Sequence, residues 1–215
     1  TLHQVGSTGV GALTLAFIIL LVCTLVFVQK SQAAANKSVA YLSIYICGFA
    51  AMSYFAMLSG QGWTTVAGCR QFFYARYLDW AITFPLMTLL LGVVAGVDMV
   101  CIFGAIGAQE IQLFAQYIGA ISTVMSVKWM WFLISLTALA GAVYHIVQVF
   151  KASADAKGGE VAALYGKVAW LAAGLWCMYP VVWLFSEGFA SFSVSFEITA
   201  YAILDVCMKY PPPNL

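Results

Sequence analysis

The sequence predicts an all-α membrane protein, a seven-transmembrane helix bundle that forms a single domain over residues 1–215. Composition is the first reason: 64% of the residues are apolar and only 8% are charged, whereas a soluble domain carries about 25% charged residues. The second reason is that the apolar residues fall into seven runs, each close to the ~20 residues that a spanning helix needs. The connections between the runs are short, so no second domain is expected.

The seven apolar runs give the predicted helices in chain order. They cover residues 9–29, 38–58, 71–95, 99–121, 128–150, 161–186 and 193–210. In lipid the backbone must hydrogen-bond within its own segment, so each run is expected to be helical. A transmembrane barrel would need strict alternation in segments of about ten residues, and these runs are apolar on all sides.

Each run is bounded by residues that interrupt an apolar helix. A polar start without the basic region of a signal peptide precedes the first run, which we therefore expect to be retained. The later runs are separated by QKSQAAANK, SGQGWTTVAG, AGVD, STVMSVK, KASADAKGGE and SEGFASFS. The final YPPPNL cannot continue a regular helix, so the seventh helix is expected to end about one turn after Lys209. Either the chain belongs to a longer one or the inner side of the bundle is open.

The distribution of basic residues predicts the orientation. Five lysines fall on one side of the predicted membrane: Lys30, Lys37, Lys151, Lys157 and Lys167. The loops on the other side hold Arg70 and Lys128. By the positive-inside rule the lysine-rich side is cytoplasmic, and the N-terminus lies outside.

The composition also excludes several classes of function. The net charge is +1 and no basic patch is present, so no nucleic-acid partner is expected. The six cysteines are scattered without CxxC spacing, and we therefore predict neither a metal site nor a disulfide framework. The lipid bilayer is the first partner, and the sequence does not suggest an enzyme.

A few ionisable residues are predicted to lie within, or at the outer end of, the helices, where each costs at least ~2.5–3.5 kcal/mol on insertion scales. They are Arg76, Asp79, Glu110, Glu197, Asp205 and Lys209. Asp205 and Lys209 are four residues apart and Arg76 and Asp79 three apart, so each pair shares one helix face. Two carboxylates, one lysine and one arginine could therefore meet inside the bundle. The alternative is an ion-pair network that only fixes helix packing, which is a weak source of net stability.

A buried lysine in this setting has a chemical use. Apolar surroundings favour its neutral amine, which can condense with an aldehyde. The resulting cation needs a carboxylate counter-ion, and Asp79 and Asp205 are the candidates. Transfer of its proton to an adjacent carboxylate would move charge across the membrane.

Three motifs on three predicted helices resemble those of microbial rhodopsins. Arg76-Tyr77-Leu78-Asp79-Trp80, followed by Thr83 and Pro85, is similar to the family's third helix. Trp176-Cys177-Met178-Tyr179-Pro180-Val181-Val182-Trp183 resembles the sixth, and Leu204-Asp205-Val206-Cys207-Met208-Lys209 the seventh. The resemblance implies all-trans retinal, bound covalently as a Schiff base on Lys209.

The same resemblance implies roles for individual residues. Asp79, supported by Thr83, would be the primary counter-ion and proton acceptor, and Asp205 the second counter-ion, held by Tyr54 and Tyr179. Arg76 would lie between that centre and the releasing pair Glu187 and Glu197. The implied cofactor contacts are Tyr54, Trp80, Gln112, Trp176, Tyr179 and Trp183. Gln112 belongs to a polar stripe with Gln109 and Gln116, which would either touch the far end of retinal or form interhelical hydrogen bonds.

One position departs from the family's proton pumps. In those pumps a carboxylate follows the acceptor by eleven residues, ~16 Å along the helix, and here that residue is Leu90. Reprotonation from the inside should therefore be slow. We predict a light-driven outward proton pump, because both outer glutamates are retained. A sensory photoreceptor with a transducer partner and a light-gated ion channel are the alternatives, and a homo-oligomer is a further partner that the resemblance allows.

Overall fold

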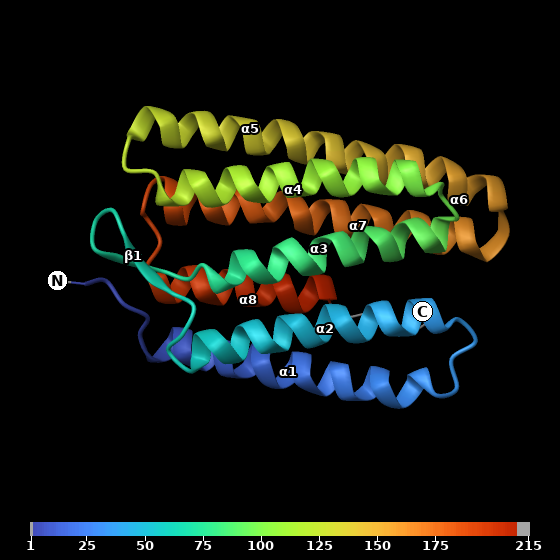
Figure 1. Cartoon of the computed structure of the whole chain (residues 1–215), viewed down its shortest axis with the longest axis horizontal. Helices are drawn as coiled ribbons and strands as arrows, with labels where there is room; N and C mark the ends of the chain where they lie inside the picture. The colour runs from blue at the N-terminus through green and yellow to red at the C-terminus, as the bar shows by residue number, and fades with distance from the viewer. Residues whose placement is uncertain (1, 210–215) are drawn as a thin grey trace.

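Seven helices run alongside one another in a bundle, as the sequence predicts (Figure 1). The computed structural model describes residues 2–209. The first four helices are α1 (Ser7–Ser31), α2 (Lys37–Leu58), α3 (Ala75–Ala95) and α4 (Met99–Ile121). The fifth consists of α5 (Met125–Tyr144), the π-helical η1 (His145–Phe150) and α6 (Lys151–Lys157). The sixth consists of α7 (Gly159–Trp183) and the π-helical η2 (Leu184–Gly188), and the seventh is α8 (Val194–Lys209). The predicted bounds of the fourth helix agree with α4 at both ends.

The surface of the bundle suits a bilayer. Six of the helices, among the residues that the structure describes, are long and apolar enough to span one, and α8 is the seventh. Large apolar side chains face outward along their length, including Leu15, Met52, Phe55, Val100 and Phe103. In water such a surface would drive association, whereas in lipid it is the expected exterior of a helix bundle.

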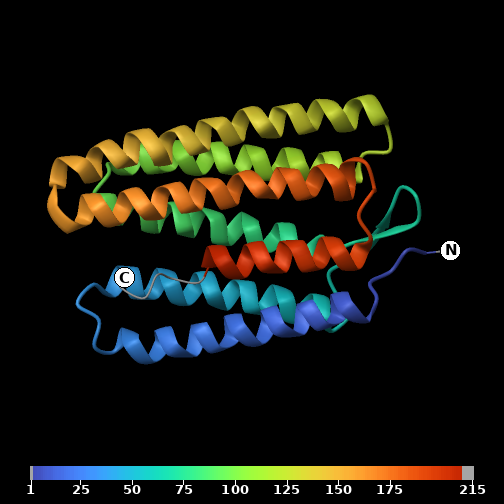
Figure 2. The ribbon, with the colours of Figure 1, turned by 180° about the vertical axis from the view of Figure 1, so that it is seen from behind.

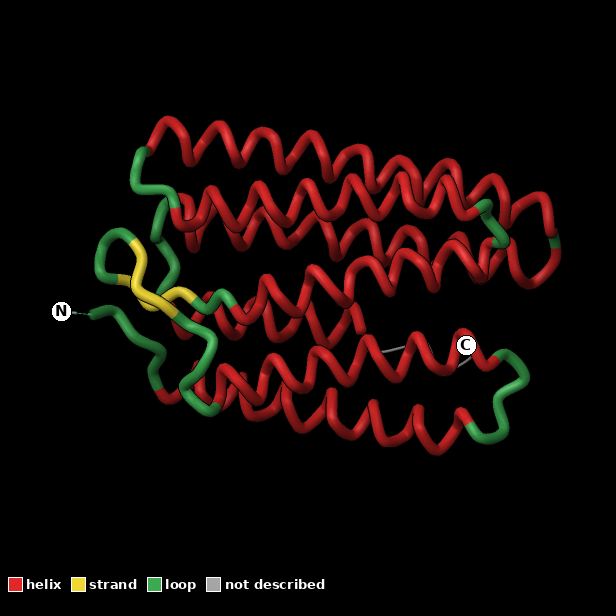
Figure 3. The backbone as a smooth tube through the Cα atoms, in the orientation of Figure 1, coloured by secondary structure: helices red, strands yellow, loops and turns green. Residues whose placement is uncertain are grey.

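The first correction concerns the connection before the third helix. The prediction began that helix at residue 71, but residues 70–72 form β2 (Arg70–Phe72), which pairs antiparallel with β1 (Thr64–Val66). Gly68 and Cys69 turn the chain with φ values of 80° and 54°. His3 adds a parallel bridge to Arg70, so the start of the chain is tied to this hairpin. Figure 3 shows the strands at the end of the bundle where the chain begins.

The second correction concerns the connection between the fifth and sixth helices. The predicted break KASADAKGGE is mostly helical, because α6 continues the fifth helix to Lys157. An ion pair between Lys151 and Asp155, one turn apart at 2.5 Å, lies along this turn of helix. The chain reverses at Gly158, whose φ of 70° is readily adopted only by glycine.

The short helix α8 is packed between α1 and α7 and closes the ring of helices. One buried apolar cluster joins α8 to the side formed by α3 to α7, and a second joins it to α1 and α2. Figure 2 shows α8 ending about midway along its neighbours, so Lys209 lies deep within the bundle. The predicted continuation of this helix beyond Lys209 lies outside the described residues.

The two ends of the bundle differ in their number of lysines. We call the outer end the one that carries the N-terminus, the hairpin and the connections at 122–124 and 189–193. The inner end carries the connections at 32–36, 96–98 and 158, with the lysines of the predicted cytoplasmic side close to them in the chain. Figure 1 shows the N-terminus and the 32–36 connection at opposite ends.

Candidate functional site

The centre of the candidate site is the ammonium group of Lys209. Its Nζ lies 2.6 Å from Oδ2 of Asp79 and 3.4 Å from Oδ1 of Asp205. The lysine side chain is 0% exposed and each acid 1%. The two helix faces singled out in the sequence therefore meet, and they place one cation between two anions. Burial of all three groups without pairing would be prohibitively costly.

The two aspartates differ in what else they contact. Asp205 accepts hydrogen bonds from Tyr54 at 2.7 Å, Tyr179 at 2.7 Å and the indole Nε1 of Trp80 at 2.9 Å. Both of its oxygens are thereby fixed. Oδ1 of Asp79, by contrast, is buried and has no hydrogen-bond partner among the described residues.

Thr83 contacts Asp79 in a way that the sequence did not indicate. Its hydroxyl donates to the backbone carbonyl oxygen of Asp79 at 3.0 Å, one helical turn away. This bond ties the threonine to the main chain of α3. Oδ1 of Asp79 stays available to accept a proton.

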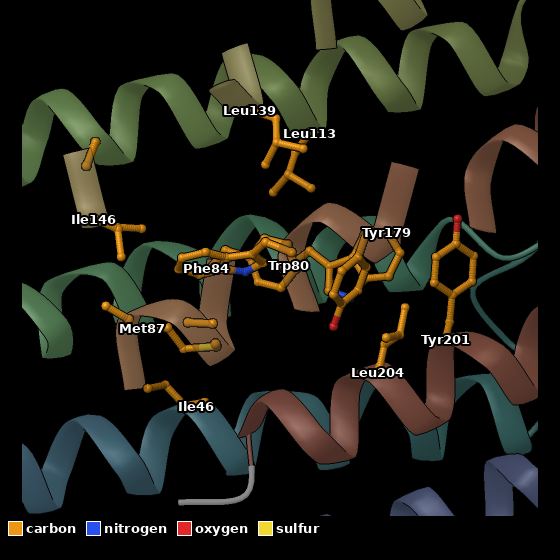
Figure 4. Close-up of a cluster of buried hydrophobic side chains, with 14 of the residues drawn as sticks. Ile46, Trp80, Phe84, Met87, Leu113, Leu139, Ile146, Tyr179, Tyr201 and Leu204 are labelled. Carbon is orange, nitrogen blue, oxygen red and sulfur yellow. The ribbon is translucent and has the colours of Figure 1, made fainter. Parts of the chain in front are cut away.

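Aromatic side chains pack beside the ion pairs. Trp80 meets Tyr179 edge to face with ring centroids 5.0 Å apart, and Phe84 contacts Trp176 at 5.8 Å. Trp183 stacks on Phe132 at 5.0 Å. Figure 4 shows Trp80, Phe84 and Tyr179 gathered in the middle of the bundle, with Leu113 of α4 and Leu139 of α5 above them in this view. Phe84 and Phe132 were missed in the sequence, because a single phenylalanine in an apolar run carries no signal of its own.

The glutamine stripe on α4 is buried and only partly paired. The hydroxyl of Thr88 on α3 donates a hydrogen bond to Oε1 of Gln109, which is the interhelical bond predicted as one alternative. The backbone oxygen of Gln116 accepts from the indole of Trp183 at 3.1 Å. The amide nitrogens of Gln112 and Gln116 are buried and have no partners among the described residues. Contact between Gln112 and a cofactor stays a prediction.

A second group of charges lies toward the outer end. Arg76 donates to Oε1 of Glu197 at 2.6 Å and lies 3.8 Å from Glu187. Its guanidinium also stacks over Tyr201, 4.2 Å from the ring centroid. Lys128 donates to the backbone oxygen of Glu187 at 2.8 Å. The predicted trio of one arginine and two glutamates is therefore in contact, and its side chains are at most 3% exposed.

This outer group contains one residue that sequence reasoning missed. Nη2 of Arg70 lies 2.5 Å from Oε2 of Glu197, although the sequence placed Arg70 only in a loop. The residues are 127 positions apart, and no local spacing connects them. The hairpin brings Arg70 over the start of α8.

The inner side of Lys209 is different in character. A cavity of about 640 Å³ opens there, and Leu90, Leu91, Met208 and Lys209 are among its lining residues. The described residues around it include Lys30 but no carboxylate. Leu90 thus occupies a position between the site and the inner end, with no acid to pass a proton on.

The site has the chemistry to hold a covalently attached cation. A buried amine lies beside two carboxylates that can balance its charge, and aromatic rings provide apolar walls. The indole Nε1 of Trp176 and Oδ1 of Asp79 are buried without partners among the described residues. A buried amine between two carboxylates, with aromatic side chains beside it, fits an apolar aldehyde that condenses with Lys209.

Comparisons with known proteins agree with this arrangement. A sequence profile of the family described as bacteriorhodopsin-like protein matches residues 10–211. Archaerhodopsin-2 of Halobacterium sp. (strain aus-2) is 30% identical over 94% of this chain and 79% of its own length. Sensory rhodopsin-2 of Natronomonas pharaonis is 31% identical over 97% of this chain and 84% of its own. The crystal structure of the light-driven proton pump Coccomyxa subellipsoidea rhodopsin superposes with a TM-score of 0.94 at 29% identity, covering 97% of this chain and 95% of that one.

Proposed function

The chain belongs to the bacteriorhodopsin-like family, and from that premise we propose that it is a light-driven outward proton pump with all-trans retinal bound to Lys209. The protein is accordingly an integral, multi-pass membrane protein. Its family includes both pumps and a sensory rhodopsin, so the proposal rests on the site. The observation that carries it is the unequal pair Asp79 and Asp205 around the amine of Lys209.

Retinal would be held by Lys209 and by the aromatic side chains around it. When bound, it supplies a covalent, proton-bearing linkage to the lysine, visible absorption and a light-driven change of shape. Trp80, Trp176, Tyr179 and Trp183 provide apolar walls that exclude water from the charges. Exclusion of water strengthens the attraction between Lys209 and its carboxylates, because screening is weak in a low dielectric.

Asp79 is the proposed proton acceptor because of its contacts. It lies 2.6 Å from Nζ of Lys209, and its second oxygen can receive a proton without breaking an existing bond. Asp205 already accepts three hydrogen bonds from side chains besides Lys209, and protonation there would disturb that arrangement. Asp205 therefore serves as the constant anion, and Asp79 as the one that changes charge.

The outer charges provide the proposed exit. Arg76 contacts both Glu187 and Glu197 and lies one helical turn before Asp79 on α3. Neutralisation of Asp79 would remove one attraction on the arginine and leave its outer partners dominant. The lysine-rich inner end supports an orientation with the N-terminus outside.

The inner side explains the proposed uptake of the next proton. Leu90 stands where the family's pumps have a carboxylate, and the cavity beside it contains no described acid. Protons would therefore come from solution, and uptake would limit turnover. No enzymatic activity is part of this proposal.

A sensory photoreceptor is the second candidate, because Leu90 lacks a donor function and sensory rhodopsin-2 is as similar as the pumps. Light-induced pH change in vesicles, with and without a protonophore, distinguishes the candidates. Outward transport that persists at zero membrane potential supports a pump. Currents that reverse with the gradient would instead show a light-gated channel, and visible absorption without either would favour the sensor. Vesicles without retinal are the control.

A further inference from the structure

The two outer glutamates are held very differently. Glu197 pairs with an arginine at each oxygen: Oε2 with Arg70 at 2.5 Å and Oε1 with Arg76 at 2.6 Å. Glu187 lies 3.8 Å from Arg76, and its Oε1 is 3.4 Å from the hydroxyl of Tyr77. Its Oε2 is buried and has no partner among the described residues.

These contacts fix the charge of Glu197. An ionised carboxylate accepts a hydrogen bond at each oxygen more strongly than the neutral acid does, and a guanidinium is always a donor. A proton on either oxygen of Glu197 would therefore weaken its bond to an arginine, which can only donate. Two short charge-assisted bonds also favour the anion strongly in a buried site. Glu197 has no position at which a proton would leave both arginine bonds at full strength.

Glu187 has such a position. Its unpartnered oxygen can carry a proton without displacing any bond, and burial next to a fixed anion favours its neutral form. The charged or titratable groups that face it are Arg70 of β2, Arg76 and Tyr77 of α3, Lys128 of α5, and Glu197 and Tyr201 of α8. Of the cations, Arg70 and Arg76 make their short contacts with Glu197, and Lys128 bonds the backbone of Glu187.

Arg70 is built into the outer end of the bundle. Its Nη1 donates to the backbone oxygen of Phe192 at 2.8 Å, in the connection before α8. The N-terminal segment is bonded to the hairpin on either side of Arg70. The backbone N–H of His3 donates to the carbonyl oxygen of Cys69, and the backbone N–H of Gln71 donates to that of His3. Oε1 of Gln71 accepts from the backbone N–H of Val5. Arg70 also lines an outer cavity of about 580 Å³, together with His3, Gln4 and Ser191. It therefore separates Glu197 from the solution outside.

We propose that Arg70 is a positioning residue that holds Glu197 as a permanent anion, so that Glu187 alone carries the proton that leaves at the outer end. Without Arg70, the side chains of both glutamates would share Arg76 and could share a proton between them. The inference deepens the proposed pump and rests on it for the release step. The location of the proton in the dark can be measured without any transport.

Infrared spectroscopy of the retinal-loaded protein in the dark, with ¹³C-labelled glutamate, tests the proposal. The label separates glutamic-acid carbonyl bands from those of Asp79 and Asp205. A Glu110→Gln background removes a half-buried carboxyl on α4 that would also contribute. We expect one remaining labelled band, its loss in Glu187→Gln, and the loss of light-induced proton release to a pH-indicator dye in the same variant.

Substitution of Arg70 gives the second part of the test. In Arg70→Gln the labelled band should shift and broaden, because the proton is then shared with Glu197, and Arg70→Lys should restore the original band. Gln71→Ala is the matched control, since it loosens the N-terminal segment but does not contact Glu197. Visible absorption of each variant reports that the bundle has assembled.

Persistence of the band in Glu187→Gln, or an unchanged band in Arg70→Gln, would overturn the assignment. The same shift in Gln71→Ala would show that the hairpin acts by its structure rather than by the charge of Arg70, and would also overturn it. If the bands behave as expected but vesicles show no outward transport, the pump fails while the location of the proton is supported.

Discussion

The bundle contains two pairs of buried carboxylates, and each pair is unequal. In the inner pair, Asp205 is fixed by three donors and Asp79 keeps a free oxygen. In the outer pair, Glu197 is fixed by two arginines and Glu187 keeps a free oxygen. Each pair therefore has one member whose oxygens are both held and one with an unpartnered oxygen, as the proposed roles of constant anion and proton carrier require.

The pairs differ in how the constant anion is held. Neutral hydroxyl and indole donors hold Asp205, so its negative charge remains to balance the cation on Lys209. Arginines hold Glu197, so its charge is more than neutralised by their two positive charges. The inner pair can thus attract a positive charge, while the outer pair can give up a proton from Glu187 with little accumulation of negative charge. In the proposed pump, Arg76 links the two pairs, because it contacts the outer glutamates and lies one helical turn from Asp79.

Removal of Lys209 is expected to have the largest effect, because the inner pair balances its charge and the cofactor would be attached to it. Lys209→Ala should abolish visible absorption after addition of all-trans retinal, since no other described lysine lies inside the bundle. Absorption spectroscopy is the measurement, and Lys128→Ala, at the outer end of α5, should stay coloured. A coloured Lys209→Ala protein would contradict the central assignment.

Replacement of each aspartate in turn by asparagine tests which of the two changes charge. Asp79→Asn should abolish outward transport and shift absorption to the red, because loss of the nearby negative charge lets positive charge spread away from the lysine. Asp205→Asn should give the smaller red shift. Both variants are measured by absorption and by light-induced pH change. A larger shift in Asp205→Asn would transfer the counter-ion role to that residue.

A carboxylate at position 90 would give the inner side the acid that the outer side has. Leu90→Asp should speed the recovery of the dark absorption after a flash and make it nearly independent of pH between about pH 5 and 9, because a desolvated carboxyl holds its proton to higher pH. In the natural protein recovery should slow as pH rises. Leu90→Asn, of similar shape but without a proton to donate, is the control. Fast, pH-independent recovery of the natural protein would reveal a donor elsewhere, with Glu110 the first to test.

Removal of one neutral donor should have the smallest effect. Tyr179→Phe leaves Asp205 with Tyr54 and Trp80, so transport should continue. A hydrogen bond to a charged group contributes about 1.5–3 kcal/mol, and the free energy of unfolding should fall by about that much. Thermal loss of colour measures it, with Tyr165→Phe as a control that removes a hydroxyl bonded only to a backbone oxygen. If Tyr179→Phe lowers the temperature of colour loss no more than Tyr165→Phe does, Asp205 is held by packing rather than by its hydrogen-bond donors.

The sequence determined the helices because their signal is local. Apolar runs long enough to span a bilayer predict helices wherever the backbone must satisfy itself, and the prediction of seven is confirmed. The family was also readable from the sequence, since its motifs lie in short segments of α3, α7 and α8. The same local logic failed where segments were short or polar. β1 and β2 have three residues each, and α6 is polar enough to resemble a loop.

Helix periodicity also placed Lys209 on one face with Asp205, and Arg76 on one face with Asp79. Those two faces meet only because α8 is packed against the rest of the bundle. Which aspartate keeps a free oxygen was not readable from spacing, since it depends on donors from α2, α3 and α7 arriving together at Asp205.

The tertiary structure alone decided the partner of Glu197. Arg70 reaches it because a hairpin, tied to the first residues of the chain, folds over the start of α8. The two residues are 127 positions apart. Helix and strand periodicity relate only residues that are close in the chain, so no pattern in the sequence indicates this pairing. The residue types determine which side chains can carry charge in this protein, and packing determines which of them meet.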